Sequence, residues 1–319
     1  MSNISSYYHV DAQKLRRHYK HKSSNFSTWE QKEHSESYLL YPQNIGPNLS
    51  IDEVSLSKGE LYTYVTNKAA KGKKGTLVAS IKGTLSADII SVLKKIPLEQ
   101  RKQVREVTLD MANNMSYSVK MAFPEAMLTT DHFHVIKLGM EALQHIRIKH
   151  RWEEMDKENQ AIKEAKEKGL KHQPELLSNE DTPKQLLARC RYIVAKKTSE
   201  WTSTQAERAK LLFERYPVIE KAYKHVLQLR GFYTNECRTK AETELKEWLE
   251  KTKELAIKEF NTVANTIEDK METILNYFVH KNTNANAESF NAKIKLFRAN
   301  LRGVTDTKFF LFRMEKLFS

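Results

Sequence analysis

The chain has 319 residues, of which 40% are hydrophobic and 29% charged, as in an ordinary globular protein. This length allows two domains, or one large domain with an insertion. The net charge of +13 favours a polyanionic partner, of which nucleic acid is the commonest. Cys190 and Cys237 form no CxxC pair, which argues against a zinc site or a disulfide framework.

Nothing in the sequence predicts association with a membrane. The first twenty residues lack the apolar core of a signal peptide. Apolar runs also stay well below the ~18 residues of a membrane-spanning helix. We therefore expect a soluble protein of a reducing cytoplasm.

Residues 1–48 are polar, with scattered aromatic residues and weak periodicity, and the pattern sharpens from residue 49. Strand-like composition predicts five strands, and apolar spacing predicts two short helices among them. The second and third strands are expected to pair antiparallel across the basic turn 68–75. The order predicts a mixed sheet with helical crossovers: strands 49–56, 59–67 and 76–84, helix 86–96, strand 104–110, helix 115–124, strand 126–131.

After residue 132 the pattern is helical, with predicted helices at 134–169, 181–197, 201–217 and 241–278. Two of them begin with a capping box, formed by Thr182 with Gln185 and by Thr202 with Gln205. Trp201 and Trp248 lie in this helical block, where core packing is the favoured interpretation for both rings.

A last helix is predicted near residue 290, because Phe290, Ile294, Phe297 and Leu301 form one apolar stripe. Glu288 lies in its first turn, where the helix dipole favours a carboxylate. Basic side chains lie off the stripe and are candidates for contact with phosphate: Lys293, Lys295, Arg298 and Arg302. The basic turn adds Lys71, Lys73 and Lys74, although a solvated charged surface explains such residues equally well.

Three carboxylates could form a catalytic centre. Asp52 lies in the first strand, Asp110 ends the fourth, and Glu288 opens the last helix. Carboxylates that converge at one sheet edge can hold Mg²⁺, and two such ions can promote cleavage of a phosphodiester. By spacing alone, strand-end aspartates are more often turn formers or caps, so the pattern leaves both interpretations open.

Several segments, in order, resemble bacterial insertion-sequence transposases of the ISL3 family. They include "LSIDEVSL", "VTLDMANNM", "TTDHFHVIKL", "ALQHIRIKHRWEEMDKEN" and "TNANAESFNAKIKLFRANLRGV", and the similarity runs from about residue 25 to the end. The resemblance implies an α/β fold: an RNase H-like mixed sheet interrupted by a large all-α insertion domain, with a DDE catalytic triad.

The resemblance assigns the triad residue by residue. Asp52 in "IDE" matches the first aspartate, Asp110 in "TLDMA" the second, and Glu288 in "NAESFNAKIK" the glutamate. The motif "DHFH" gives Asp131 and His134 as supporting residues, although the family usually has arginine where this chain has His132. A rival assignment uses Asp110 and Asp131 as the two aspartates. It ranks second because RNase H-like sites use the first and fourth strands.

We expect four segments: an N-terminal polar or helical segment (1–48), the first part of the catalytic domain (49–137), the helical insertion (138–279), and a C-terminal part that completes the catalytic domain (280–319).

The implied function is DNA transposition of a mobile element. The enzyme would cleave the element's ends and join their 3′-hydroxyls to target DNA, with two Mg²⁺ ions and with Mn²⁺ able to substitute. Expected partners are the terminal inverted repeats, target DNA, further copies of the chain, and a helix-turn-helix protein encoded separately. The alternatives are an RNase H-like nuclease or resolvase, and a transposase-derived DNA-binding protein without catalysis.

Overall fold

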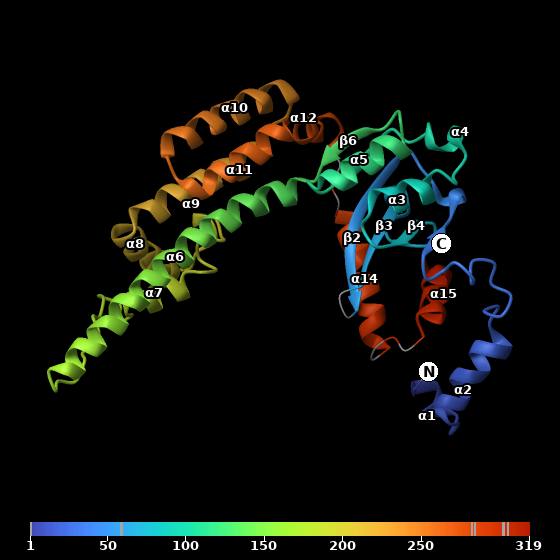
Figure 1. The fold of residues 1–319 in the computed structure, drawn as a ribbon, viewed down its shortest axis with the longest axis horizontal. Helices are drawn as coiled ribbons and strands as arrows, with labels where there is room; N and C mark the ends of the chain where they lie inside the picture. The colour runs from blue at the N-terminus through green and yellow to red at the C-terminus, as the bar shows by residue number, and fades with distance from the viewer. Residues whose placement is uncertain (1, 58–59, 282, 284, 302–303, 305) are drawn as a thin grey trace. The chain divides into compact units, whose positions relative to one another are not determined.

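The computed structural model describes residues 2–57, 60–281, 283, 285–301, 304 and 306–319 (Figure 1). The chain divides into two compact units. The sheet unit comprises Met1–Asp131 and Asn282–Ser319, and the helical unit comprises His132–Lys281. A segment from the end of the sequence thus folds with the first 131 residues. Among the described residues, every helix is too short or too polar to cross a lipid bilayer.

The sheet unit is built on a six-stranded mixed sheet in the order β1-β4-β3-β2-β5-β6. β1 through β4 pair antiparallel, whereas β2, β5 and β6 run parallel to one another. The predicted antiparallel pairing of the second and third strands of the sequence is confirmed by β3 and β4. The strand bounds are β1 Tyr38–Leu40, β2 Asn48–Ser57, β3 Glu60–Asn67, β4 Leu77–Lys82, β5 Glu106–Leu109 and β6 Met127–Thr130.

One face of the sheet packs against α3 (Ser86–Leu93) and α5 (Asn113–Ala122), with the short α4 (Leu98–Arg101) between them in sequence. Because side chains alternate along a strand, Leu49 and Ile51 of β2 point into this core. The predicted apolar face of α3 is confirmed, since Ile89 and Leu93 are fully buried there. This layer orders the strands that carry the candidate site.

The other face of the sheet is covered by the C-terminal helices α14 (Ala285–Asn300) and α15 (Thr307–Phe318). Phe290 and Ile294 are completely buried against Val54 and Tyr64 of the sheet, which confirms the predicted stripe. Figure 1 shows α14 running beside β2. The polar residues Ser50 and Asp52 of β2 alternate with the residues of the first core, so they belong to this second face.

The N-terminal segment contributes to the same core, because Phe26 and Trp29 pack edge-on against Phe312 of α15. Its elements are α1 (Ser2–Tyr7), α2 (Ala12–His18), a π-helical turn at Tyr19–Ser23 and a 3₁₀ turn at Pro42–Asn44. The sheet prediction omitted β1, whose three residues are too short to show an alternating pattern.

The helical unit begins with α6, a single helix of 36 residues. Both predicted capping boxes are present, at Thr182 and Thr202. Trp248 is buried and donates its indole N–H to the carbonyl of His225, and Trp201 stacks on Tyr223, so both rings pack within this unit. The helices are α6 His132–Glu167, α7 Pro183–Arg189, α8 Ser203–Arg215, α9 Pro217–Phe232, α10 Arg238–Leu255, α11 Lys258–Asp269, α12 Met271–Leu275 and α13 Tyr277–His280.

The prediction of one continuous helix over 241–278 is wrong. The chain breaks after α10, where Ala256 adopts a left-handed φ of 52° and caps the helix. Ile257 then turns inward and is buried, and α11 starts directly after it. Burial of Ile257 and of the apolar face of α11 favours the turn over helix propensity.

Acid should destabilise the helical unit through His225. Its ring is buried against Trp248, and Nε2 lies 2.6 Å from Thr252 Oγ1. Burial lowers the pKa of His225 to about 4, a hydrogen bond between its ring and Gln228 opposes that shift, and the positive charge of Lys251 adds to it. The unfolded chain therefore binds a proton between pH 6.5 and 4 that the folded chain does not. Over that window, stability should fall by up to about 3 kcal/mol.

Urea denaturation at pH 7 and pH 4.5 tests this prediction. His225→Gln should lose much of the acid sensitivity, whereas the exposed control His145→Gln should keep it. The same loss of stability at pH 4.5 in His225→Gln as in the unaltered chain would contradict the assignment.

Candidate active site

The candidate site starts from the register of the three parallel strands. Ser50 pairs with Thr108 across β2 and β5, and Leu109 pairs with Thr130 across β5 and β6. If these registers are continued by one or two residues, Asp52, Asp110 and Asp131 lie level with one another on the neighbouring strands β2, β5 and β6. Neighbouring strands lie about 5 Å apart. The sheet therefore brings together three acids that are widely separated in the sequence.

Asp52 is tied to the helix that covers its face of the sheet. Its Oδ2 accepts a hydrogen bond from Nδ2 of Asn291 in α14, at 2.5 Å, and its Oδ1 accepts one from the N–H of Glu53. Asn291 is buried, and the two partners are 239 residues apart in the sequence. This hydrogen bond holds α14 against β2 at the position of Asp52.

Asp110 follows the last residue of β5 and is half-buried. Its Oδ1 accepts a hydrogen bond from the N–H of Ala112 at 2.9 Å, which shapes the turn into α5. The turn-forming interpretation of this aspartate is thus realised in the structure. It is compatible with a ligand role, because the carboxylate keeps a second oxygen.

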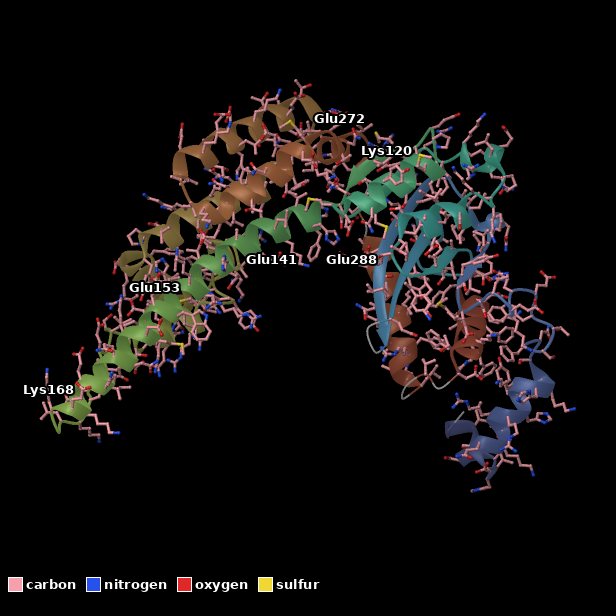
Figure 2. The ribbon with its side chains drawn as sticks, viewed as in Figure 1. Lys120, Glu141, Glu153, Lys168, Glu272 and Glu288 are labelled. Carbon is pink, nitrogen blue, oxygen red and sulfur yellow. The ribbon has the colours of Figure 1, made fainter. Side chains whose placement is uncertain are left out.

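Glu288 lies in the first turn of α14, as the sequence predicts, and its side chain is exposed (Figure 2). It precedes Asn291 by three positions, so the two side chains share one side of the helix. The carboxylate of Glu288 is thus about one turn of helix away from the bond between Asn291 and Asp52. α14 thus places Glu288, the third predicted acid, on the same side of the helix as the residue that contacts Asp52.

Glu53 adds a carboxylate that the sequence analysis did not select. Burial raises the pKa of Glu53, the negative charge of Asp110 raises it further, and a hydrogen bond from Asn114 opposes both effects. Glu53 is therefore close enough to Asp110 for their charges to interact. The only sequence feature that could have pointed to Glu53 is its place directly after Asp52, in "IDE".

A buried lysine lies beside this acidic row. The ammonium of Lys68 donates a hydrogen bond to Thr108 Oγ1 of β5. Burial lowers the pKa of Lys68 to about 8, and the charges of Glu106 and Asp131 oppose this shift. Both acids are about 1% exposed, so Lys68 is a counter-charge for carboxylates that are costly to bury. The sequence analysis had grouped Lys68 with an exposed basic turn.

The two supporting residues fall in different units. Asp131 ends the sheet unit, and its N–H donates to the carbonyl of Leu109, which extends the pairing of β5 and β6. His134 is in the first turn of α6, half-buried, with its ring edge-on to Phe133. His132, at the atypical position of the motif, packs with Tyr233 and Tyr277.

Basic side chains from two segments meet in the sheet unit. Lys293 of α14 donates from its ammonium to the carbonyl of Gly72 at 2.8 Å, so it contacts the turn that contains Lys71, Lys73 and Lys74. These lysines and Lys295 are exposed, and Arg298 is half-buried. Arg302, the remaining predicted contact, lies outside the described residues. The described part thus contains a basic surface that joins the turn to α14.

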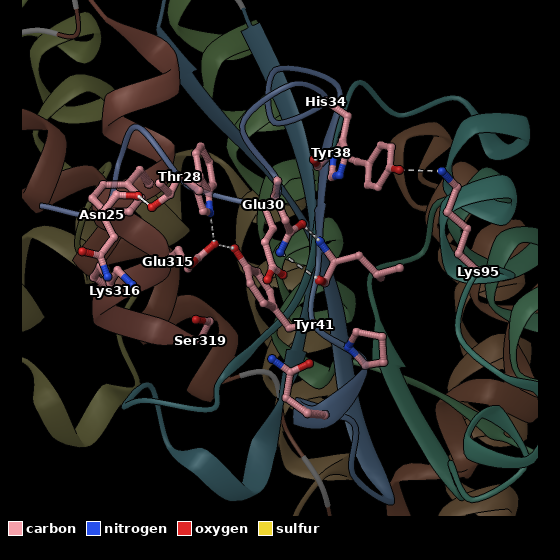
Figure 3. A pocket seen from close by; sticks show the side chains of 16 residues that line it. Asn25, Thr28, Glu30, His34, Tyr38, Tyr41, Lys95, Glu315, Lys316 and Ser319 are labelled. Carbon is pink, nitrogen blue, oxygen red and sulfur yellow. Dashed lines mark hydrogen bonds between the residues drawn. The ribbon is translucent and has the colours of Figure 1, made fainter. Parts of the chain in front are cut away.

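A separate cavity of about 680 Å³ lies between β1, the N-terminal segment and α15 (Figure 3). Its polar groups contact one another: Glu315 accepts hydrogen bonds from the Trp29 indole and the Tyr41 hydroxyl, and the Gln31 amide pairs with both backbone groups of Leu40. Gln31 thereby blocks the open edge of β1. None of the triad residues lines this cavity.

The donor chemistry of the acidic row suits a hard divalent cation, since carboxylate oxygens are the ligands that Mg²⁺ prefers. In the described part of the chain, however, no three His, Cys, Asp or Glu side chains are grouped closely enough to hold a metal ion. Asp52 and Asp110 are neighbours, and Glu288 would have to approach them. The metal-binding role of the three acids stays a prediction.

Comparison with known families identifies the chain. A family model for transposases of the ISL3 type, which carry a DDE motif, matches residues 49–314. The chain belongs to the ISL3 family of DDE transposases. The matched range contains all three acids and extends through both units. No curated protein and no solved structure matches the chain. As a transposase, the chain binds DNA and catalyses its cleavage and transfer.

In this transposase, Lys68→Met should destabilise the sheet unit by roughly 3 kcal/mol, because two buried carboxylates lose their counter-charge. Removing one of those charges in the double variant Lys68→Met/Asp131→Asn should restore part of the stability. Thermal unfolding of the single and double variants measures this coupling.

Lys74→Met, at an exposed position of the same turn, is the matched control and should unfold like the original chain. Equal losses in the single and double variants would show that Lys68 acts by filling space rather than through its charge.

Proposed function

We propose that the chain is a Mg²⁺-dependent insertion-sequence transposase with an RNase H-like catalytic domain. That domain would comprise segments 49–137 and 280–319, interrupted by the helical insertion at 138–279, with 1–48 as an N-terminal extension. One observation carries the proposal: the register of β2 and β5 brings Asp52 level with Asp110, while Asn291 holds the helix of Glu288 against Asp52.

The topology supports an RNase H-like core. β4, β3 and β2 form an antiparallel meander, and the two parallel strands β5 and β6 continue the sheet on the other side of β2. Asp52 and Asp110 come from the first and fourth strands of this five-stranded core. The rival pairing of Asp110 with Asp131 is disfavoured because Asp131 is buried beside Lys68.

Each residue has a distinct role in the proposal. Asp52, Asp110 and Glu288 would hold two divalent ions, for which either Mg²⁺ or Mn²⁺ is suitable. Asn291 orients the Asp52 carboxylate, and Asp131 with Lys68 keeps the strand ends in register. Bound ions would lower the pKa of an attacking hydroxyl and stabilise the leaving oxygen of the phosphodiester. The reaction products would be a cleaved element end and a joined 3′ end.

The basic surface formed by the turn and α14 would position DNA at these acids. Lysine and arginine contacts to phosphate fix the register of a duplex without reading its sequence. Lys71, Lys73, Lys74, Lys293, Lys295, Arg298 and Arg302 are the proposed contacts. Recognition of terminal repeats would need contacts to the bases, for which a separately encoded helix-turn-helix protein is the proposed partner, and joining two ends would need more than one copy of the chain.

Asp110→Asn should abolish both cleavage of repeat-end DNA and strand transfer, because an amide cannot replace a carboxylate ligand of Mg²⁺. Binding to the same DNA should change by less than about threefold. The measurement follows labelled repeat ends with Mg²⁺ and a target duplex, with Asp88→Asn, an exposed aspartate of α3, as the control. Cleavage by the Asp110→Asn variant would refute the triad, and cleavage without joined products would favour a nuclease.

Asn291→Ala should raise the Mg²⁺ concentration needed for half-maximal cleavage several-fold, because Asp52 loses the donor that orients it. Asn291→Asp should be more severe, since it places a second negative charge against Asp52. Mg²⁺ titration of the cleavage rate tests both variants, and Asn300→Ala, exposed on the same helix, is the control. An unchanged Mg²⁺ requirement in both Asn291 variants would show that Asn291 does not orient the Asp52 carboxylate for metal binding.

A further inference from the structure

An exposed surface of the helical unit combines aromatic and cationic side chains. We call it the arginine–aromatic patch, formed by Ile148, Arg151, Trp152, Arg191 and Tyr192. Trp152 is 58% exposed, Tyr192 68% and Ile148 39%, so three large apolar side chains face solvent together with two arginines. Large side chains of this kind are rarely left exposed as a group without a binding role.

The patch combines residues of α6 with the segment that follows α7. The side chain of Gln144 in α6 donates to the carbonyl of Arg191 at 2.9 Å, which holds the segment after α7 against α6. Gln144, Ile148 and Trp152 follow at intervals of four residues, so they lie on one side of α6. In Figure 2 this part of α6 lies between the labelled Glu141 and Glu153. From Gln144 to Trp152 the helix extends about 12 Å.

The patch is strongly positive. Arg147 is buried beneath it and donates to the side chain of Gln144 and the carbonyl of Leu187. Burial lowers the pKa of Arg147, and the positive charges of Arg191 and Arg151 lower it further, so the three guanidinium groups are close together. Within the described residues, neither Arg151 nor Arg191 forms an ion pair. Such a cluster attracts a polyanion.

We propose that the arginine–aromatic patch binds a DNA strand with unpaired bases, as a second DNA contact outside the carboxylate site. Arginines would contact the phosphates, and the exposed rings of Trp152 and Tyr192 would stack on bases, the combination used for single-stranded nucleic acid. Arg191 already lies against the Tyr192 ring, with its guanidinium carbon 5.3 Å from the ring centroid.

A second copy of the chain fits this surface less well. In a two-fold symmetric dimer the same patch would face itself, and Arg151 and Arg191 would oppose their own counterparts. Like charges at the centre of an interface oppose association. DNA supplies the complementary charge. The inference rests on the proposed function to the extent that DNA is the substrate.

Binding of fluorescein-labelled oligothymidine and of a random-sequence duplex to the full chain, measured by anisotropy without Mg²⁺, tests the patch separately from catalysis. Trp152→Ala and Tyr192→Ala should each weaken oligothymidine binding roughly tenfold and duplex binding less. The variant Arg151→Gln/Arg191→Gln should weaken binding of both probes and reduce the salt dependence by about two phosphate contacts. The control Lys163→Gln/Lys240→Gln removes two exposed charges elsewhere in the same unit.

Affinities of all patch variants equal to that of the control would overturn the inference and leave the proposed function standing. Unchanged DNA affinity with loss of self-association in sedimentation would also overturn it, in favour of a protein interface. Failure of the unaltered chain to bind either probe would overturn the proposed function together with the patch. Circular dichroism of each variant verifies that the helical unit is folded.

Discussion

The hydrogen bond between Asp52 and Asn291 is the contact on which the candidate site depends. It joins a strand near the start of the chain to a helix near its end, across 239 residues of sequence. Burial of Phe290 and Ile294 supports it, because these side chains anchor α14 on the same face of the sheet. Without this anchoring, Glu288 would have no defined relation to the two aspartates, and the proposed three-acid site could not form.

Charge compensation is the second constraint. The parallel strands carry acids, at Asp52 within β2 and directly after β5 and β6, and burying acids without compensation would cost several kcal/mol each. The sheet unit uses Lys68 against Glu106 and Asp131. The helical unit solves the same problem at Asp181, which is fully buried and is paired with Arg189 and Arg208. In both units these buried carboxylates lie beside cations, whereas the lysines of the basic turn and of α14 are exposed.

Family membership identifies the activity of the chain, whereas the fold explains how its acidic residues can meet. The family assignment makes the chain a transposase, and the register of the parallel strands explains how acids distant in sequence can converge. The helical unit is more than a spacer in this view, because α6 carries both a buried core and a solvent-facing cationic surface. DNA held at two places would be restrained in orientation as well as in position.

Sequence patterns alone were enough to predict the strands between residues 49 and 131, the capping boxes, the apolar stripe of α14 and, through resemblance, the family. These features depend on neighbours within one or two turns of chain, so local patterns record them. Four features became evident only in the folded chain: Asn291 contacts Asp52, Lys68 is buried, β1 joins the sheet, and the helix before Ala256 ends there. Each of these depends on burial against residues far away in sequence, which no local period of hydrophobicity encodes.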